Sequence, residues 1–210
     1  MSRGRFITVE GGEGVGKTTN VEFIESLLRN HGIEFVSTRE PGGTPLAEKI
    51  RTLLLGLDDE TLDPSAELLL IFAARAQHIS QLIKPALDNG SWVVCDRFTD
   101  ATYAYQGGGR GINMALISQL EHSVQQGLHP DLTLLLDIDP ELGLQRARSR
   151  AALDRFEQEE LPFFNRVRES YLERAQLQPE RYALIDANAP LSNVQHNIEA
   201  ALRPLLQNSC

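Results

Sequence analysis

The strongest chemical signal in the chain is a run of eight residues, Gly11-Gly12-Glu13-Gly14-Val15-Gly16-Lys17-Thr18. It fits the pattern G-x-x-x-x-G-K-[ST], whose glycines allow successive backbone N–H groups to converge on phosphate oxygens. An apolar run precedes it and a helical pattern follows, so a bound phosphate would lie at the positive end of a helix. Lys17 would reach the β and γ phosphates of a nucleotide, and the Thr18 hydroxyl would hold Mg²⁺. The spacing therefore predicts a phosphate-binding loop.

Polar residues also follow the next two apolar runs. Arg39-Glu40-Pro41-Gly42-Gly43-Thr44 follows residues 35–37, and Asp96-Arg97-Phe98 follows residues 92–95. Ligands of open α/β sheets bind beyond the carboxyl ends of the strands, so both segments are expected beside the phosphate-binding loop. The Asp96 carboxylate could act on Mg²⁺ directly or through water, or it could serve only as a cap.

A third group of charged residues is rich in arginine. Arg146, Arg148 and Arg150 alternate with small residues, and Asp154-Arg155 follows them. A charge run is usually a solvated face. In an acidic protein with a phosphate-binding loop, however, such arginines could close over transferring phosphates, and Arg146 and Arg150 would share one helix face. We therefore expect a short lid at about residues 146–158.

The elements that must position these residues are short apolar strands between helical patterns. Continuous apolar strands of this kind are typical of a parallel sheet covered on both faces. We expect an α/β fold of the P-loop NTPase type, with three α/β/α layers and a five-stranded parallel sheet, in a single domain over residues 1–210. The expected strands are residues 6–9, 35–37, 92–95, 132–138 and 182–185.

Helix boundaries are indicated by capping residues. Thr44 before Pro45, and Asp63 before Pro64, read as N-caps followed by proline at the first helical position. The second of these helices should be interrupted at Pro85. Asn113 is expected to cap a helix that runs to about residue 126, and Ser192 to cap the last one.

Composition limits the class of protein. The 210 residues carry a net charge of -9, which argues against nucleic-acid binding. No apolar run approaches the roughly 20 residues that span a bilayer, and the N-terminus lacks the apolar core of a signal peptide, so we expect a cytoplasmic protein without a membrane partner. Cys95 and Cys210 are predicted to be a buried thiol and a terminal one, rather than a disulfide.

Several longer motifs together resemble the thymidylate kinase family, bacterial enzymes that phosphorylate dTMP to dTDP. They cover nearly the whole chain: EGGEGVGKTT, TREPGGTPLAEKIR, FAARAQ, DRFTDATYAYQGGGRG, PDLTLLLD and RARSRAALDRFEQE. The resemblance implies ATP as phosphoryl donor, Mg²⁺, a role in dTTP synthesis and a homodimer. Because the positions between Gly11 and Gly16 are not basic whereas the predicted lid is, the chain resembles the subgroup that places its arginines in the lid.

The resemblance also implies roles for single residues at the donor side. ATP would contact the loop from Gly11 to Thr19, with Arg146 nearer the adenine and residues 186–191 beneath it. Arg150 would stabilise charge on the γ-phosphoryl group, with Arg155 as a lesser candidate, while Arg148 would face solvent. The catalytic set implied is Lys17, Arg97, Arg150 and Glu13, with Thr18 and Asp96 at the metal.

At the acceptor side, Arg97 and Arg51 would hold the dTMP phosphate, and a guanidinium fork suits two phosphate oxygens. Glu13 would face the sugar 3′-hydroxyl and the metal. Glu40 would order its edge through metal-bound water or act only as a turn carboxylate. Four further positions would meet the nucleoside: Arg75 at thymine O4, Thr102 and Gln106 at the base or its phosphate, and Tyr105 at the sugar 2′ position. Phe72 would stack on the base, although the family's aromatic position is Ile71, or pack in the core.

Two alternatives remain open at this point. The chain could be another nucleoside monophosphate kinase, acting for instance on dUMP or dCMP, because one methyl group discriminates by only about 1–3 kcal/mol. It could also be a nucleotide-dependent switch, although the N-K-x-D and D-x-x-G elements of signalling GTPases do not occur in it.

Overall fold

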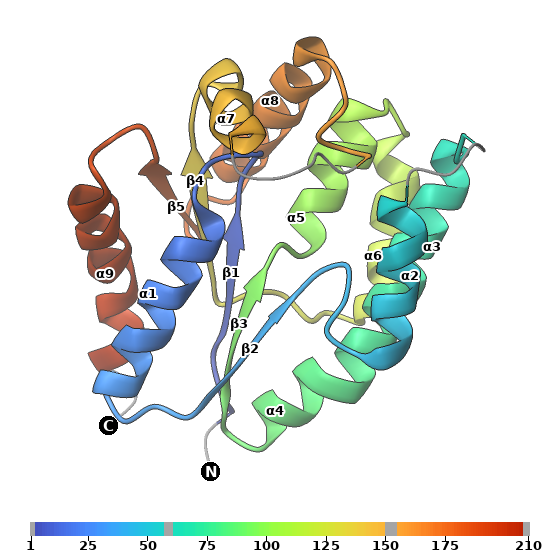
Figure 1. Ribbon diagram of the computed structural model, residues 1–210. Helices are drawn as coiled ribbons and strands as arrows, with labels where there is room; N and C mark the ends of the chain where they lie inside the picture. The colour runs from blue at the N-terminus through green and yellow to red at the C-terminus, as the bar shows by residue number, and fades with distance from the viewer. Residues whose placement is uncertain (1–2, 57–60, 150–154, 208–210) are drawn as a thin grey trace.

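The computed structural model describes residues 3–56, 61–149 and 155–207 and has a parallel five-stranded sheet at its centre (Figure 1). The strand order is β2-β3-β1-β4-β5, and every neighbouring pair is parallel. The strands are β1 (Phe6–Glu10), β2 (Phe35–Arg39), β3 (Trp92–Asp96), β4 (Leu132–Asp137) and β5 (Tyr182–Asp186). The predicted fold class is therefore confirmed.

Helical segments connect the strands. Eight are α-helices of at least five residues: α1 (Lys17–Asn30), α2 (Pro45–Leu55), α3 (Pro64–His78), α4 (Lys84–Asp88), α6 (Met114–Gln125), α7 (Pro140–Arg148), α8 (Leu161–Leu177) and α9 (Leu191–Gln207). A short helix, α5 (Thr99–Thr102), and two π-helical segments, η1 (Ile79–Ile83) and η2 (Tyr103–Gly109), complete the described elements. None of the helices in the described part of the chain has both the length and the apolar content to cross a bilayer.

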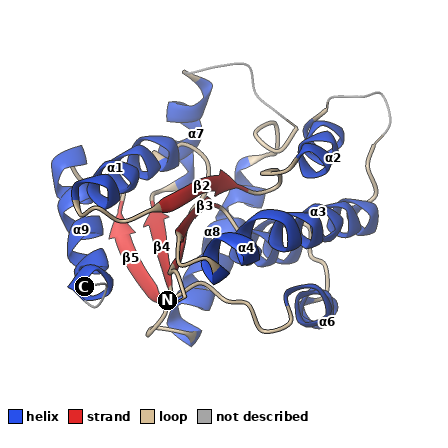
Figure 2. Cartoon of the chain, turned by 90° about the horizontal axis from the view of Figure 1, so that it is seen from below, coloured by secondary structure: helices blue, strands red, loops and turns tan. Residues whose placement is uncertain are grey.

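Helices pack on both faces of the sheet, as Figure 2 shows in a view along it. On one face α1 and α9 cover Ile7 and Val9, which are fully buried. On the other face, Phe6 packs with η1 and α4, and Leu135 packs with α8. Because successive side chains of a strand point to opposite faces, each central strand contributes to two cores. This layered packing fixes the carboxyl edge of the sheet, where the polar residues collect.

Four of the five strands extend one or two residues beyond the predicted apolar runs. Each of the five ends on a charged residue that terminates the apolar pattern: Glu10, Arg39, Asp96, Asp137 and Asp186. Apolar periodicity recognises only the apolar part of a strand, so it misses a charged last residue even where that residue is buried, as Glu10 is. These charged residues are thus part of the sheet, and its hydrogen bonds fix their backbone positions.

Helix capping was predicted well, with two corrections. The side chains of Thr44, Asp63 and Asn113 all accept hydrogen bonds from the first turns of their helices. Pro85 does not interrupt the helix, because the π-helical turn η1 leads directly into α4 and places this proline in the first turn of α4. Ser192 is not the N-cap of α9, since the helix begins one residue earlier and the Pro190 carbonyl accepts from the following N–H groups.

Behind the sheet edge, Asp100 is a buried carboxylate with two arginine partners. Its exposed side-chain fraction is 1%, and it accepts from Arg174 Nε at 2.7 Å and from Arg181 Nη1 at 2.8 Å. Burial alone would raise its pKa, but hydrogen bonds and attraction from Arg181 and Arg174 outweigh burial and lower the pKa to about 2. Cys95 is buried, as predicted, and Cys210 lies outside the described residues.

We predict that Asp100→Asn weakens the acid dependence of stability. A carboxyl group whose pKa is lowered on folding adds roughly 2 kcal/mol to the free energy of unfolding at neutral pH, and this contribution is lost as pH falls from its ordinary pKa of 3.8 through about 2. Urea unfolding between about pH 5 and pH 2 should therefore show a shallower decline for the variant. Asp88→Asn, at an exposed carboxylate on α4, is the control. Parallel curves for Asp100→Asn and the wild type would contradict the assignment.

Candidate active site

The predicted phosphate-binding loop lies between β1 and α1 and forms the floor of the site. Gly14 and Gly16 have φ values of 70° and 88°, and Gly16 is the N-cap of α1. Lys17 Nζ donates to the carbonyls of Gly11 at 3.2 Å and Gly12 at 2.8 Å. Burial lowers the pKa of Lys17, and the nearby Arg97 acts in the same direction. The loop therefore offers a buried cation beside the N-terminus of a helix, which suits a bound polyphosphate.

The two residues predicted to hold Mg²⁺, Thr18 and Asp96, both lie at this edge. Asp96 Oδ1 is buried without a hydrogen-bond partner among the described residues, at the end of the strand next to β1. Thr18 is exposed in the first turn of α1. No group of three or more His, Cys, Asp or Glu residues with metal-binding geometry occurs within the described ranges. Mg²⁺ commonly uses one or two protein ligands together with substrate phosphates, so these two residues fit it.

An open cleft lies beside the loop, and the empty space in it, including the part open to solvent, is about 630 Å³. Seven of the eight residues predicted to contact the acceptor nucleotide line it, namely Glu40, Arg51, Arg75, Arg97, Thr102, Tyr105 and Gln106, and Glu13 lines it too. Three of these residues, Glu13, Glu40 and Arg97, lie in the segments that follow β1, β2 and β3. The others lie on α2, α3, α5 and η2. The structure thus brings together residues that are up to 93 positions apart, from Glu13 to Gln106.

The loop and the cleft meet at an ion pair. Arg97 Nη2 donates to Glu13 Oε1 at 2.5 Å and to the Tyr105 hydroxyl at 2.9 Å, and that hydroxyl donates to the same Glu13 oxygen at 2.7 Å. Burial alone would raise the pKa of Glu13, but the charges of Arg97 and Lys17 outweigh it and lower the pKa to about 2. Glu13 is therefore ionised at neutral pH. Its carboxylate holds the Arg97 guanidinium between the phosphate-binding loop and the cleft.

Arg75 forms the inner wall of the cleft. Its Nε donates to Glu40 Oε2 at 2.7 Å, and its Nη2 donates to the Phe98 carbonyl at 3.1 Å and the Thr102 hydroxyl at 2.9 Å. The remaining nitrogen, Nη1, is buried without a partner among the described residues. A guanidinium fixed by three hydrogen bonds, with the two N–H groups of Nη1 left over, is suited to bind a carbonyl oxygen of a ligand.

Glu40 acts in the structure through direct contacts. One carboxylate oxygen accepts from Arg75, and the other is 2.9 Å from His78 Nδ1. Its side chain is 4% exposed. Both oxygens thus have protein partners, and a role of Glu40 through metal-bound water stays a prediction. His78 gave no signal in the sequence, because its partner lies 38 positions away.

Phe72 is the one predicted acceptor residue that the structure does not bring to the cleft. Its ring packs in a core cluster with Leu68, Tyr103 and Ile117, whereas Ile71 lines the cleft. Neighbouring helix positions point about 100° apart, and here Ile71 faces the cleft while Phe72 faces the core. Phe156, which sequence reasoning missed, lines the cleft and meets the Tyr105 ring edge to face at 5.9 Å.

The predicted lid is described in part. Arg146 Nη1 donates at 3.1 Å to the carbonyl of Ala187, in the loop after β5 that was expected beneath adenine, and Arg148 is exposed. Arg155 donates to the Leu54 carbonyl and to Glu67, and Leu54 lines the cleft. Arg150 lies outside the described residues.

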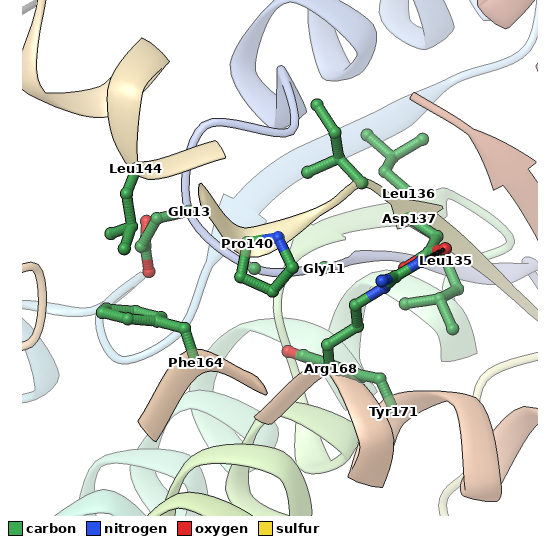
Figure 3. Close-up of a pocket in the computed structure, with 12 residues that line it drawn as sticks. Gly11, Glu13, Leu135, Leu136, Asp137, Pro140, Leu144, Phe164, Arg168 and Tyr171 are labelled. Atoms are coloured by element: carbon green, nitrogen blue, oxygen red, sulfur yellow. Dashed lines mark hydrogen bonds and ion pairs between the residues drawn. The ribbon is translucent and has the colours of Figure 1, made fainter. Parts of the chain in front are cut away.

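A smaller cavity lies beneath the loop between β4, α7 and α8 (Figure 3). In it Arg168 points toward Asp137 and donates to both carboxylate oxygens, at 2.7 and 2.8 Å. Apolar side chains such as Leu144 and Phe164 form most of the remaining wall. Arg168 and Asp137 thus pair with each other, and Gly11, Gly12 and Glu13 of the loop form another part of the wall.

The helix that leads into the lid touches the phosphate-binding loop through backbone atoms. A Cβ atom added to Gly14 would lie 1.9 Å from the carbonyl oxygen of Gly143 in α7, and one added to Gly143 would lie 2.4 Å from the carbonyl oxygen of Glu13. Such distances leave no room for a side chain at either position. The base of α7 is therefore held directly against the loop.

Fold and site together define a phosphoryl-transfer enzyme of the P-loop nucleotide kinase class: a glycine loop at the carboxyl edge of a parallel sheet, beside a second cleft lined by arginines. A family model described as thymidylate kinase matches residues 9–198. The chain therefore belongs to the thymidylate kinase family, the enzymes that phosphorylate dTMP.

Individual relatives agree over nearly the full length. The chain is 60% identical over 203 residues to the thymidylate kinase of Teredinibacter turnerae, an alignment that covers 97% of this chain and 99% of that protein. It is 57% identical over 204 residues to the thymidylate kinase of Pseudomonas putida strain GB-1, covering 97% of each. The crystal structure of thymidylate kinase from Ehrlichia chaffeensis superposes with a TM-score of 0.77 at 35% identity, covering 95% of this chain and 99% of that one.

We predict that Gly143→Ala impairs the donor site. The added methyl group must displace either α7 or the phosphate-binding loop, because it would overlap the Glu13 carbonyl. A shift of about 1 Å in such a site can cost up to about 100-fold in rate, so kcat should fall and the KM for ATP should rise. Steady-state kinetics with Gln145→Ala, an exposed position on the same helix, provide the control. Equal ATP parameters for the two variants would show that the contact is dispensable.

Proposed function

We propose that this protein transfers the γ-phosphoryl group of ATP, in line, to a 5′-phosphate oxygen of dTMP, giving dTDP and ADP for dTTP synthesis. The observation that carries this proposal is the Glu13–Arg97 pair, which joins the phosphate-binding loop to the acceptor cleft at 2.5 Å. Two phosphate groups bound on either side of that pair would meet end to end. The acceptor oxygen is already anionic, so alignment and charge neutralisation can suffice without a strong general base.

The donor side is assigned to the loop and the lid. Backbone N–H groups of residues 11–19 and the Lys17 ammonium bind the donor phosphates, and Arg146 lies beside the adenine loop. Thr18 and Asp96 hold Mg²⁺, directly or through water, and the ion neutralises charge on the phosphates.

Among the lid arginines, Arg150 is assigned to the γ-phosphoryl group, as in the subgroup with arginines in the lid. A loss of kcat on the order of 10²- to 10⁵-fold in Arg150→Ala, but not in the exposed Arg148→Ala, is the test of that role.

The acceptor side is assigned to the cleft. Arg97 and Arg51 hold the dTMP phosphate, and the free Nη1 donor of Arg75 faces thymine O4. Thr102 and Gln106 complete the polar wall, and the Tyr105 ring, fixed by its two hydroxyl hydrogen bonds, favours a sugar without a 2′-hydroxyl group. The rigid placement of these groups by Glu40 and Glu13 supports a selective acceptor site.

The homodimer implied by the family is proposed on the side formed by α2, α3 and α6, which lie together in Figure 2. Large apolar side chains are exposed there: Leu53 by 60%, Leu69 by 57% and Leu116 by 42%. Clusters of exposed apolar residues commonly mark protein–protein interfaces. Sedimentation of Leu53→Asp, which should become monomeric at a concentration where the wild type is dimeric, checks this.

A cytoplasmic location stays a prediction.

The acceptor preference can be measured directly. With ATP and Mg²⁺, kcat/KM should be highest for dTMP and lower for dUMP by roughly 10- to 200-fold, the usual value of one methylene in a pocket. Omission of Mg²⁺ should abolish ADP release. A higher kcat/KM for dUMP, dCMP or dGMP would show a different monophosphate kinase. Tight ATP binding without any phosphorylated acceptor would instead indicate a switch protein.

A further inference from the structure

Arg97 combines a functional side chain with an unusual backbone. Its φ is 65°, one of only two positive values among the non-glycine residues of the described chain. A side chain in this left-handed region costs free energy, and the conformation persists only where surrounding groups determine it. Arg97 lies between β3 and α5, and its guanidinium donates a hydrogen bond to Glu13. Some part of the structure must therefore hold this backbone.

Three hydrogen bonds fix the backbone of Arg97. Its N–H donates to the Val9 carbonyl at 3.0 Å, and its carbonyl accepts from Cys95 Sγ at 3.0 Å. The N–H of the next residue, Phe98, donates to Glu10 Oε1 at 2.7 Å. The peptide group between Arg97 and Phe98 is thus held on its oxygen by a buried thiol and on its nitrogen by a buried carboxyl group.

Glu10 is placed in the sheet so that it can make this contact. It is the last residue of β1, fully buried, on the same face as Phe6. Its second oxygen accepts from the Tyr171 hydroxyl of α8 at 2.8 Å. Burial raises the pKa of Glu10 to about 8, and the nearby Asp100 acts in the same direction. A carboxyl group is costly at this core position, where an apolar residue would pack without penalty, so its presence calls for a specific role.

We propose that Glu10 is a positioning residue for the acceptor phosphate: by accepting from the Phe98 N–H, it holds Arg97 in the left-handed conformation that presents its guanidinium to dTMP. The inference rests on the proposed role of Arg97 in binding that phosphate. Glu10 does not itself line the acceptor cleft. Its loss should therefore act on dTMP and leave the donor nucleotide largely unaffected.

The test compares Glu10→Met with Glu10→Gln. Methionine fills a similar volume but cannot accept from the Phe98 N–H, whereas the glutamine amide keeps that acceptor oxygen and offers an N–H to the Tyr171 oxygen. Glu10→Met should raise the KM for dTMP by about tenfold or more, equivalent to about 1.4 kcal/mol, with the KM for ATP changed by less than about twofold. Glu10→Gln should restore most of the dTMP affinity.

Arg97→Ala separates this inference from the proposed function. It should raise the KM for dTMP, and Glu10→Met should add nothing further in that background, because the group being positioned is gone. If Arg97→Ala leaves the KM for dTMP unchanged, the role proposed for Arg97 fails and the role of Glu10 fails with it. Two other outcomes would refute only the role of Glu10, given that Arg97→Ala raises the KM for dTMP. In the first, Glu10→Met and Glu10→Gln have the same KM for dTMP. In the second, Glu10→Met raises the KM for dTMP and the KM for ATP equally.

If Glu10→Met does not fold, the Tyr171→Phe variant tests the positioning role of Glu10 instead. This variant removes one hydrogen bond that orients the Glu10 carboxyl group while the ring remains in the core. Such a loss corresponds to an increase of about two- to tenfold in the KM for dTMP, again without a change for ATP. An unchanged KM for dTMP in a folded Tyr171→Phe would overturn the proposal.

Discussion

The contact between Arg97 and Glu13 organises the whole site. Lys17 and Arg97 are two cations near each other at a buried sheet edge, and each disfavours the charge of the other. Glu13 lies close to both, so its carboxylate compensates them while no phosphate is bound. This explains an acidic residue inside a phosphate-binding loop. The bound nucleotides would bring several negative charges to a site whose net charge from these three groups is +1, which favours their binding without demanding a strongly basic protein.

Much of this arrangement could be predicted from the sequence because the relevant signals are local. The glycine loop, the caps Thr44, Asp63 and Asn113, and the apolar strands each lie within a few consecutive residues. The parallel sheet then follows from their alternation, and its carboxyl edge collects the polar strand ends. The motifs shared with thymidylate kinases added the acceptor residues, seven of which the structure places around one cleft.

What could not be predicted depends on contacts between distant segments. His78 holds Glu40 across 38 positions, and Arg174 and Arg181 hold Asp100 across 74 and 81. The two π-helical segments depart from the 3.6-residue period, so ordinary helical periodicity does not describe which of their side chains are buried. The choice between Ile71 and Phe72 for the cleft likewise depends on how α3 is rotated against its neighbours, which packing decides.

The hydrogen bonds of Lys17 to the carbonyls of Gly11 and Gly12 have a consequence for turnover. A buried ammonium without partners would be strongly destabilising, and it would hold on to any anion that reached it. These two carbonyl groups accept hydrogen bonds from the ammonium and so offset the cost of its burial. Under the proposed role of Lys17, its ammonium would exchange phosphate oxygens for these peptide oxygens when ADP departs, which would favour release of the nucleotide.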